Sequence, residues 1–281
     1  MTAGAGAVAV AGPGGRRRFV APLRRAVGAD LFDSPLFADL QAFRDLLVAR
    51  DWPAIGVLDA RLALPGRRLV EQTAALLADG LHYETRIAQG RIATRAENWH
   101  DLFNALVWAC HPAIKHALNA RQCRHIAVMP PGRRNRAQAA LTQFDESGVI
   151  VRVRERALLA AWDRHDWTAL FVDNAACWRD GRIAVAAMIG HALMEQALLP
   201  GRMLVGRCVV VQGDTEDNAV AAVACAIAQG QVLDDPLQLR PLPLAGIPGW
   251  HADPPPQFYA DAAYFRPLRP GRRYPPPVSA R

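Results

Sequence analysis

The sequence predicts an α+β protein, predominantly α-helical, with a few short strands and a Pro-rich C-terminal arm. Apolar residues recur at helical spacing over 36–47 and again over 98–111. Short valine-rich runs, such as 203–211, have the composition of strands. From Asp234 onward the chain holds so many prolines that regular helix is excluded.

The order of elements follows from their start and stop signals. Residues 1–29 are rich in Ala, Gly and Arg, and we expect them to be disordered. We expect one globular domain over 30–270, because no second domain boundary is evident. Ser34 and Pro35 predict the start of its first helix, as cap and first helical residue. The further helices are expected at 98–111, 112–119, 135–144, 155–164, 166–175, 183–199 and 215–230.

The remaining segments are predicted as strands, turns and arm. A hairpin is expected over 82–95, turning at Gln89-Gly90. The other strands are expected at 124–129, 149–153 and 203–211, and Asp145-Glu146-Ser147-Gly148 is expected to be a turn. Residues 234–270 should form an extended arm whose aromatic side chains pack on the domain. Residues 271–281 are expected to be a disordered basic tail.

The net charge of +7 resembles that of a nucleic-acid-binding protein, but its distribution does not. Residues 1–29 and 262–281 contain arginines and no acids, so all 26 acidic residues lie in the slightly acidic middle. We therefore expect no nucleic-acid groove in the folded body. The basic termini could touch acidic partners weakly. Lys115 is the only lysine among 33 Lys and Arg residues.

The five cysteines are an odd number and form no C-x-x-C pair, which favours reduced thiols over disulfides or a zinc ribbon. The arginines near the N-terminus follow the apolar stretch, the reverse of a signal peptide. The longest apolar run, 183–199, contains His191 and Glu195 and is marginal for a membrane span. We expect a soluble, cytoplasmic protein with no transmembrane segment.

The helix over 98–111 carries the first candidate site. At 100° per residue, its apolar side chains share one face, and His100, Asp101, Asn104 and Trp108 lie on a neighbouring arc. His100 and Asn104 are one turn apart and could contact the same ligand. These residue types can bind protons, metals or carbonyl groups. The alternative is the ordinary polar face of an amphipathic helix.

The second candidate is the pair His191 and Glu195, at positions i and i+4 of an otherwise apolar segment. Two ionisable groups inside an interior helix must be paired, bound to a ligand or shifted in pKa. They could be a proton-transfer pair or two metal ligands, or a purely structural hydrogen bond.

The third candidate is the hairpin, where His82, Glu84 and Arg86 would share one strand face. His82 and Glu84 are candidate metal ligands, and an ordinary solvated strand face is the alternative. At the exit of the hairpin, Arg95 and Asn98 could hold a substrate anion at the start of the next helix.

Motifs for nucleotide and ester chemistry are missing. The sequence has no phosphate-binding loop, no G-x-G-x-x-G and no G-x-S-x-G. The cofactor is therefore unknown: nucleotide and Rossmann cofactors are disfavoured, and a divalent metal stays open.

Several blocks resemble a known bacterial family. They are HYETRI…GRIATRAENWHDLFNALVW…HPAIKHALN, LTQFDESGVIV, IGHALMEQAL and PLPLAGIPGWHAD…FYADAAYFRPLR. They are similar to the family called domain of unknown function 3025, from about residue 80 to 269. The resemblance implies no activity, cofactor or substrate, so it gives no residue a catalytic role.

Two function classes follow from the residues. The first is an enzyme, hydrolase-like or metal-assisted, acting on a small or anionic substrate. In it His100, Asp101, His191 and Glu195 would be catalytic, and Arg95, Asn98, Asn104 and Trp108 would bind substrate. The second is a non-catalytic binding or scaffold protein with structural His–Glu pairs. If the protein is an enzyme, at least three of six candidates should line one concavity. The six are His82, Glu84, His100, Asp101, His191 and Glu195.

Overall fold

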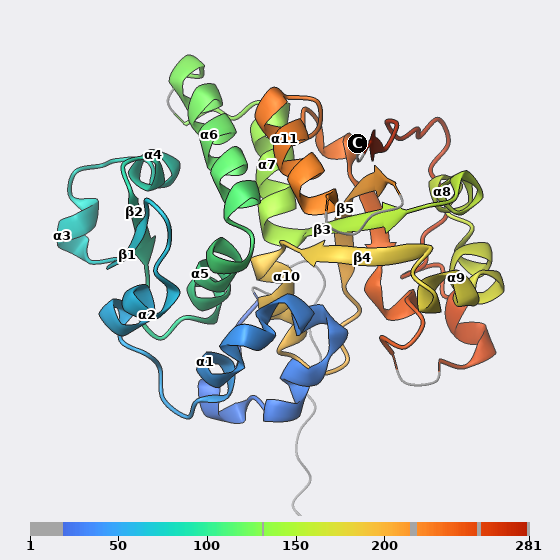
Figure 1. Ribbon diagram of the computed structural model, residues 1–281, viewed down its shortest axis with the longest axis horizontal. Coiled ribbons are helices and arrows are strands. Elements are labelled where there is room, and N and C mark those ends of the chain that lie inside the picture. The colour runs from blue at the N-terminus through green and yellow to red at the C-terminus, as the bar shows by residue number, and fades with distance from the viewer. Residues whose placement is uncertain (1–18, 131, 214–217, 252–253, 280–281) are drawn as a thin grey trace, which may run out of the picture.

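A mixed β-sheet lies at the centre of the molecule (Figure 1). The computed structural model describes residues 19–130, 132–213, 218–251 and 254–279. The strand order is β4 (Ile183–Met188), β3 (Gly148–Val153), β5 (Val205–Gln212) and β6 (Arg240–Pro243), and β7 (Val278–Ser279) also pairs with β5. The β3–β5 and β5–β7 pairs are parallel, and the β3–β4 and β5–β6 pairs are antiparallel.

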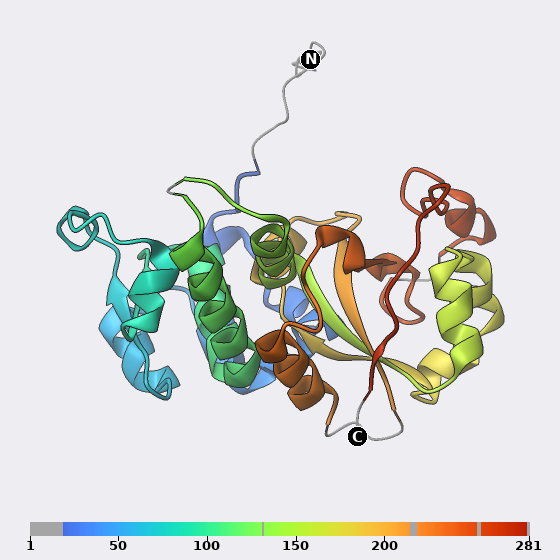
Figure 2. The same ribbon diagram turned by 90° about the horizontal axis from the view of Figure 1, so that it is seen from above.

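Strand β3 is the most buried element of this sheet, since each of its six residues is buried. A strand covered on both faces is an apolar run rather than an alternating one, which explains the sequence Val149-Ile150-Val151. Helices α7 (Arg136–Ser147), α8 (Arg156–Asp163) and α11 (Ala219–Gln229) pack against β3. Figure 2 shows helices on both sides of the sheet.

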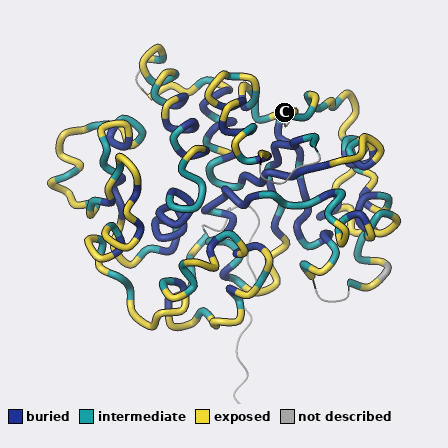
Figure 3. The backbone as a smooth tube through the Cα atoms, viewed as in Figure 1, coloured by how far each residue is buried: buried dark blue, intermediate teal, exposed yellow. Residues whose placement is uncertain are grey.

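Helix α5 (Trp99–Cys110) lies in the middle of the molecule, and most of it is buried (Figure 3). It contacts α6 (Pro112–Val128) and α10 (His191–Ala197), and α10 also contacts α7. Phe103 and Leu106 are fully buried in the hydrophobic core. The predicted apolar face of the 98–111 helix is therefore confirmed.

A second, two-stranded sheet lies beyond α5. Its strands β1 (Arg68–Glu71) and β2 (Arg91–Thr94) are parallel, and α4 (Tyr83–Ala88) packs on β2. The other α-helices are α1 (Arg44–Val48), α2 (Ile55–Leu62), α3 (Ala74–Leu77) and α9 (Ala175–Arg179). The fold class expected from the sequence, a largely helical α+β protein, is confirmed.

The predicted hairpin over 82–95 is wrong. Residues 83–88 are helical because the His82 side chain caps α4, its Nδ1 accepting the Glu84 N–H at 3.2 Å. Only β2 is a strand, and its partner is β1 rather than an antiparallel neighbour in the sequence. His82, Glu84 and Arg86 consequently do not share a strand face.

Three further local predictions are wrong. Residues 124–128 continue α6, so no strand forms there. The run 183–199 is not one helix but β4 followed by α10, because a short apolar run fits a buried strand as well as a helix. Asp145 and Glu146 lie in the last turn of α7 instead of a loop.

Both ends of the described chain are more ordered than the sequence suggested. Residues 1–18 lie outside the described residues, but Arg24 is buried and its guanidinium donates to the backbone oxygens of Leu46 and Ala49. That guanidinium also lies over the Trp99 ring, 4.9 Å from its centroid. At the other end, β7 belongs to the predicted tail and pairs with β5.

The Pro-rich arm packs on the body as expected. Tyr264 and Phe265 are buried, and the Phe265 ring contacts the rings of Trp167 and Phe171. The arm also contributes β6 to the sheet. In the described part of the chain, no helix is both long and apolar enough to cross a membrane. The single-domain organisation stays a prediction.

Candidate metal centre

The first turn of α5 is fixed by two polar contacts. Asn98 caps the helix, its side-chain oxygen accepting the Asp101 N–H at 3.0 Å. Asp101 accepts two hydrogen bonds from the Arg95 guanidinium, at 2.6 and 3.0 Å, and one from the Arg95 backbone N–H. The side chains of Asn98, Asp101 and Arg95 therefore hold the corner that positions His100.

Helix α10 begins unusually close to the end of α7. A Cβ atom at Gly190 would lie 2.6 Å from Ser147 Cα, so any larger residue would push the two backbones apart. Because residue 190 has no side chain, His191 at the start of α10 comes next to Glu146 at the end of α7.

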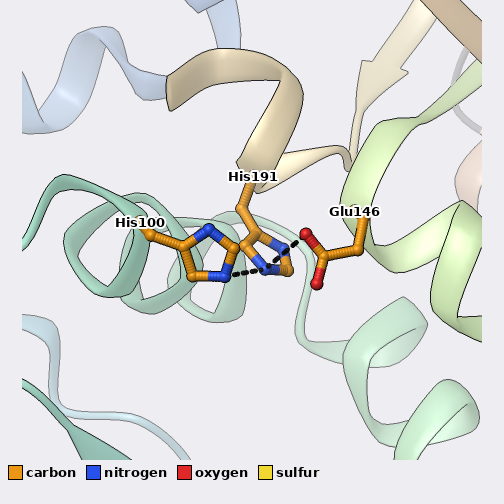
Figure 4. Close-up of side chains that lie close together, drawn as sticks. All are labelled: His100, Glu146 and His191. Atoms are coloured by element: carbon orange, nitrogen blue, oxygen red, sulfur yellow. Dashed lines mark hydrogen bonds and ion pairs between the residues drawn. The ribbon is translucent and has the colours of Figure 1, made fainter. Parts of the chain in front are cut away.

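Three side chains from three helices converge at this point: His100 of α5, Glu146 of α7 and His191 of α10 (Figure 4). The Nε2 atoms of the two histidines are 3.2 Å apart. Glu146 Oε2 is 3.8 Å from His191 Nε2. One ligand atom from each residue lies within 4.8 Å of the others, so the group could hold a metal ion.

Each histidine also has a carboxylate near its Nδ1 atom, on the side of the ring away from the other histidine. His100 Nδ1 is 3.1 Å from Glu195 Oε2. His191 Nδ1 is 4.0 Å from Asp145 Oδ2 and, within the described residues, makes no hydrogen bond of ordinary geometry. Glu195 therefore pairs with His100, and of the alternatives for His191 and Glu195 the direct hydrogen bond between the two is not formed.

The two histidines differ in basicity. Burial lowers the pKa of His191 to about 3, because the opposing charge of Asp145 is too weak to offset burial and the positive charges of Lys115 and His100 lower it further. Burial also lowers the pKa of His100, but the Glu195 hydrogen bond and the nearby carboxylates prevail, so that pKa is raised. His100 is thus the more basic of the two rings.

The acidic residues around the histidines shift in opposite directions. Burial raises the pKa of Glu146, although the charge of His100 opposes this. Burial would also raise the pKa of Asp145, but Lys115 and His191 outweigh it and hold that pKa below its usual value. Asp145 is thus a carboxylate that Lys115 keeps charged.

Lys115 of α6 is buried and joins three helices. Its Nζ donates to Asn104 Oδ1 at 2.8 Å and to Asp145 Oδ1 at 2.5 Å. Asn104 in turn donates to the Tyr83 hydroxyl at 3.0 Å. Trp108 places its ring 5.5 Å from Lys115 Nζ. These contacts continue the polar network from the histidines.

Most of these groups border one cavity of about 360 Å³: His100, Asp101, Asn104, Trp108, Lys115, Asp145, Glu146 and His191. Such a volume is at the small end of the range of small-molecule sites, about 300–1,000 Å³. His82, Glu84 and Asn119 line the same cavity, and Asn119 Nδ2 donates to Glu84 Oε2 at 2.7 Å. Burial raises the pKa of Glu84 there.

A family model described as "Protein of unknown function (DUF3025)" matches residues 67–269. The chain belongs to this family. No curated protein and no solved structure matches it. The DUF3025 segment includes His100, Glu146 and His191. Because the family has no assigned function, the chemistry must be argued from the cavity itself.

The cavity brings together most of the candidates named from the sequence. Five of the six acid/base candidates line it: His82, Glu84, His100, Asp101 and His191. The sixth, Glu195, contacts His100 from behind. Arg95, Asn104 and Trp108 also line the cavity. Asn98 does not, because its side chain is used to cap α5.

The positions of three candidates differ from their expected roles. His82 uses Nδ1 to cap α4, and Glu84 is hydrogen-bonded by Asn119, so neither belongs to the group that could hold a metal. The guanidinium of Arg95 is occupied by Asp101, which leaves it poorly placed to receive an anion.

Three residues of the site were missed by sequence reasoning. Asp145 and Glu146 were assigned to a turn, because Gly148 follows them. Lys115 received no role, although a signal existed: it is the only lysine of the chain. Nothing in the local sequence indicates that α6, α7 and α10 meet.

Proposed function

We propose that the cavity is the active site of a metal-assisted enzyme, hydrolase-like, acting on a small or anionic substrate. The observation that carries this proposal is the pair of Nε2 atoms of His100 and His191, 3.2 Å apart, with Glu146 beside them. Two imidazole lone pairs that face each other at this distance would repel. The contact requires either a hydrogen on one Nε2, as in an N–H···N hydrogen bond, or a cation bound by both lone pairs.

The spacing of the histidines suits a metal. Two Zn–N bonds of about 2.0–2.1 Å at a tetrahedral angle place the nitrogens about 3.3 Å apart. The observed 3.2 Å needs almost no rearrangement. Glu146 lies farther away, so its carboxylate must move toward the metal by about 1 Å or bind through a water.

The surroundings of the histidines also favour a metal. A ligating histidine commonly donates its other ring N–H to a carboxylate, which fixes the ring and strengthens the ligand. The Glu195 carboxylate is in place to accept such a hydrogen bond, since its Oε2 is 3.1 Å from His100 Nδ1. Asp145 lies behind His191 at 4.0 Å and would do the same after a small movement.

The roles of the candidates follow from this arrangement. His100, His191 and Glu146 would be ligands, which leaves a coordination position for water or substrate, where the metal would supply an activated water or polarise a carbonyl or phosphoryl oxygen. Glu195 and Asp145 would orient the two histidines. Asp101 would act through Arg95, since those two groups are paired. Glu84, whose pKa is raised, could donate a proton from the other end of the cavity.

A non-catalytic binding protein is the second candidate. Its supporting observation is that several polar groups of the cavity are already satisfied: Arg95 by Asp101, Glu84 by Asn119 and Lys115 by Asp145. In this candidate the histidines share a proton and only stabilise the packing of α5 on α10. It predicts no metal and no turnover.

Metal analysis of the purified protein tests the proposal. We expect stoichiometric zinc, manganese or iron, and submicromolar affinity in calorimetry of the chelated protein. His100→Ala and His191→Ala should each weaken metal binding at least about 100-fold. His82→Ala is the matched control: it removes a histidine from the same cavity but outside the ligand group, and should bind metal normally.

A substrate screen provides the second arm. Phosphoester, ester and amide substrates are assayed with and without divalent metal. Metal-dependent turnover that His100→Ala abolishes, and that His251→Ala at an exposed position outside the cavity lining retains, supports the enzyme. A protein that stays at background metal content and shows equal metal affinity in all three variants contradicts it.

A further inference from the structure

Lys115 stands out from the other basic residues of the chain. Arginine occupies every other basic position, yet this one buried site holds a lysine. A guanidinium is planar and broad, whereas an ammonium is a compact point charge with three rotatable donors. The site therefore has the size and geometry for an ammonium between α5 and α7.

Two of the three N–H groups of the Lys115 ammonium are used in hydrogen bonds within the protein. An ammonium has three N–H groups. Asn104 Oδ1 and Asp145 Oδ1 accept two of them, and within the described residues the remaining contact of Nζ is the Trp108 ring, 5.5 Å away, with no third oxygen or nitrogen acceptor. Lys115 lines the cavity. The third N–H is thus available to a molecule inside the cavity.

Asp145 ties this donor to the metal group. One of its oxygens accepts from Lys115 Nζ, and the other lies 4.0 Å from His191 Nδ1. A single carboxylate therefore spans Lys115 and His191, which puts the ammonium in the same part of the cavity as the proposed ligands.

Two of the cations that line the cavity are paired with carboxylates, so an anion would be drawn chiefly by the metal. Arg95 is neutralised by Asp101, and Lys115 by Asp145. A divalent cation on two neutral histidines and Glu146 would keep one positive charge at the metal itself, and the Glu195 carboxylate that balances it lies on the far side of His100. Lys115 could then donate a charge-assisted hydrogen bond to an anionic ligand of the metal.

We propose that the third N–H of Lys115 binds an oxygen of the substrate, and that the substrate is a small oxyanion, a carboxylate or a phosphate derivative, whose other oxygen reaches the His100–Glu146–His191 group. This inference rests on the proposed function of that group. It gives Lys115 the part that sequence analysis had assigned to Arg95.

The single lysine makes a direct test possible. Protein grown on ¹³C-labelled lysine has one Lys Cε signal in a ¹H–¹³C spectrum, that of Lys115. The zinc-loaded and metal-free proteins are titrated with acetate and with methylphosphonate, and with sodium chloride at equal ionic strength. We expect a saturable shift of the signal with at least one oxyanion and no saturable shift with chloride. The two oxyanions distinguish a carboxylate from a phosphate derivative.

Calorimetry with the better oxyanion checks the contact. Lys115→Met should weaken its binding at least about tenfold. Arg133→Met is the matched control, since it removes the same charge from an exposed residue outside the cavity lining, and should bind normally. Circular dichroism verifies that each variant is folded. If Lys115→Met does not fold, Lys115→Arg replaces it. The titration of the Lys115 signal in the unaltered protein then still shows whether an oxyanion binds.

The two proposals fail in different ways. If zinc binds but neither oxyanion shifts the Lys115 signal, the role of Lys115 is overturned and the metal centre stands. If zinc does not bind but an oxyanion shifts the signal saturably, the metal centre is overturned and the oxyanion site stands. If neither occurs, both are overturned.

Discussion

His100 and His191 face each other through their Nε2 atoms at 3.2 Å, although 91 residues separate them in the chain. His100 lies on α5 and His191 on α10, and the packing of these helices brings the rings together. Each ring has a carboxylate near its other nitrogen.

Glu195→Gln should weaken zinc binding about 10- to 100-fold without abolishing it. The amide can still contact His100 Nδ1, but it no longer supplies a negative charge behind the ring. The pKa of His100 should also fall, because Glu195 helps to raise it. Calorimetry and a histidine NMR titration measure the two effects. Gln196→Ala, at the next position of α10, is the control, and an equal loss there would contradict the role of Glu195.

His191 should make the metal-free protein less stable in acid. Its pKa is about 3 in the folded state against 6.5 for an ordinary histidine, so between these values the unfolded chain binds the extra proton. The free energy of unfolding should therefore fall as pH decreases from 6.5 toward 3, by at most about 1.4 kcal/mol per pH unit. His100, with its raised pKa, contributes in the opposite direction: its stabilisation is present below pH 6.5 and is lost as pH rises through its folded pKa.

Urea unfolding at several pH values isolates the His191 contribution. The His191→Gln variant should show a smaller loss of stability between pH 6.5 and 4.5 than the unaltered protein. Exposed His251 provides the control variant His251→Gln. Parallel stability curves for the unaltered protein and His191→Gln would contradict a neutral buried His191.

Lys115→Met should destabilise the protein by about 2–4 kcal/mol, because it leaves the Asp145 carboxylate without its cation. Asp145 is a quarter exposed on its side chain, which favours the lower end of this range. In the double variant Lys115→Met with Asp145→Asn, much of the loss should be recovered. Urea unfolding of the complete cycle measures the coupling. Additive losses would show that the pair is not coupled.

Gly190→Ala should disturb both stability and the metal centre. Its Cβ would meet the Ser147 backbone at 2.6 Å, so α10 must move away from α7 and take His191 with it. We expect a loss of about 1–3 kcal/mol and weaker zinc binding. Gly56→Ala on α2, where nothing lies within 4 Å, is the control and should be neutral or slightly stabilising. Normal zinc affinity in Gly190→Ala would contradict this account of the close approach.

Part of the site could be predicted because it depends on one helix. The 3.6-residue period put His100, Asn104 and Trp108 on one arc of α5, and all three line the cavity. The sequence also indicated that His191 is buried among apolar residues, and it is. These are local properties that spacing alone can express.

The rest depends on packing between distant segments. The spacing of His191 and Glu195 allowed them to pair, but Glu195 reaches His100 on another helix. Gly148 suggested a turn, whereas its real constraint is steric: a Cβ there would clash with the Phe144 backbone oxygen, so only glycine lets α7 pass directly into β3. Such close approaches leave no periodic signal in the sequence.

X-ray diffraction from zinc-soaked crystals, collected on both sides of the zinc absorption edge, tests the central claim most directly. We predict one strong anomalous peak between His100 Nε2 and His191 Nε2, about 2.0–2.1 Å from each, with Glu146 as a direct or water-bridged third ligand. Zinc bound elsewhere, with the two imidazoles still in direct contact at 3.2 Å, would contradict it.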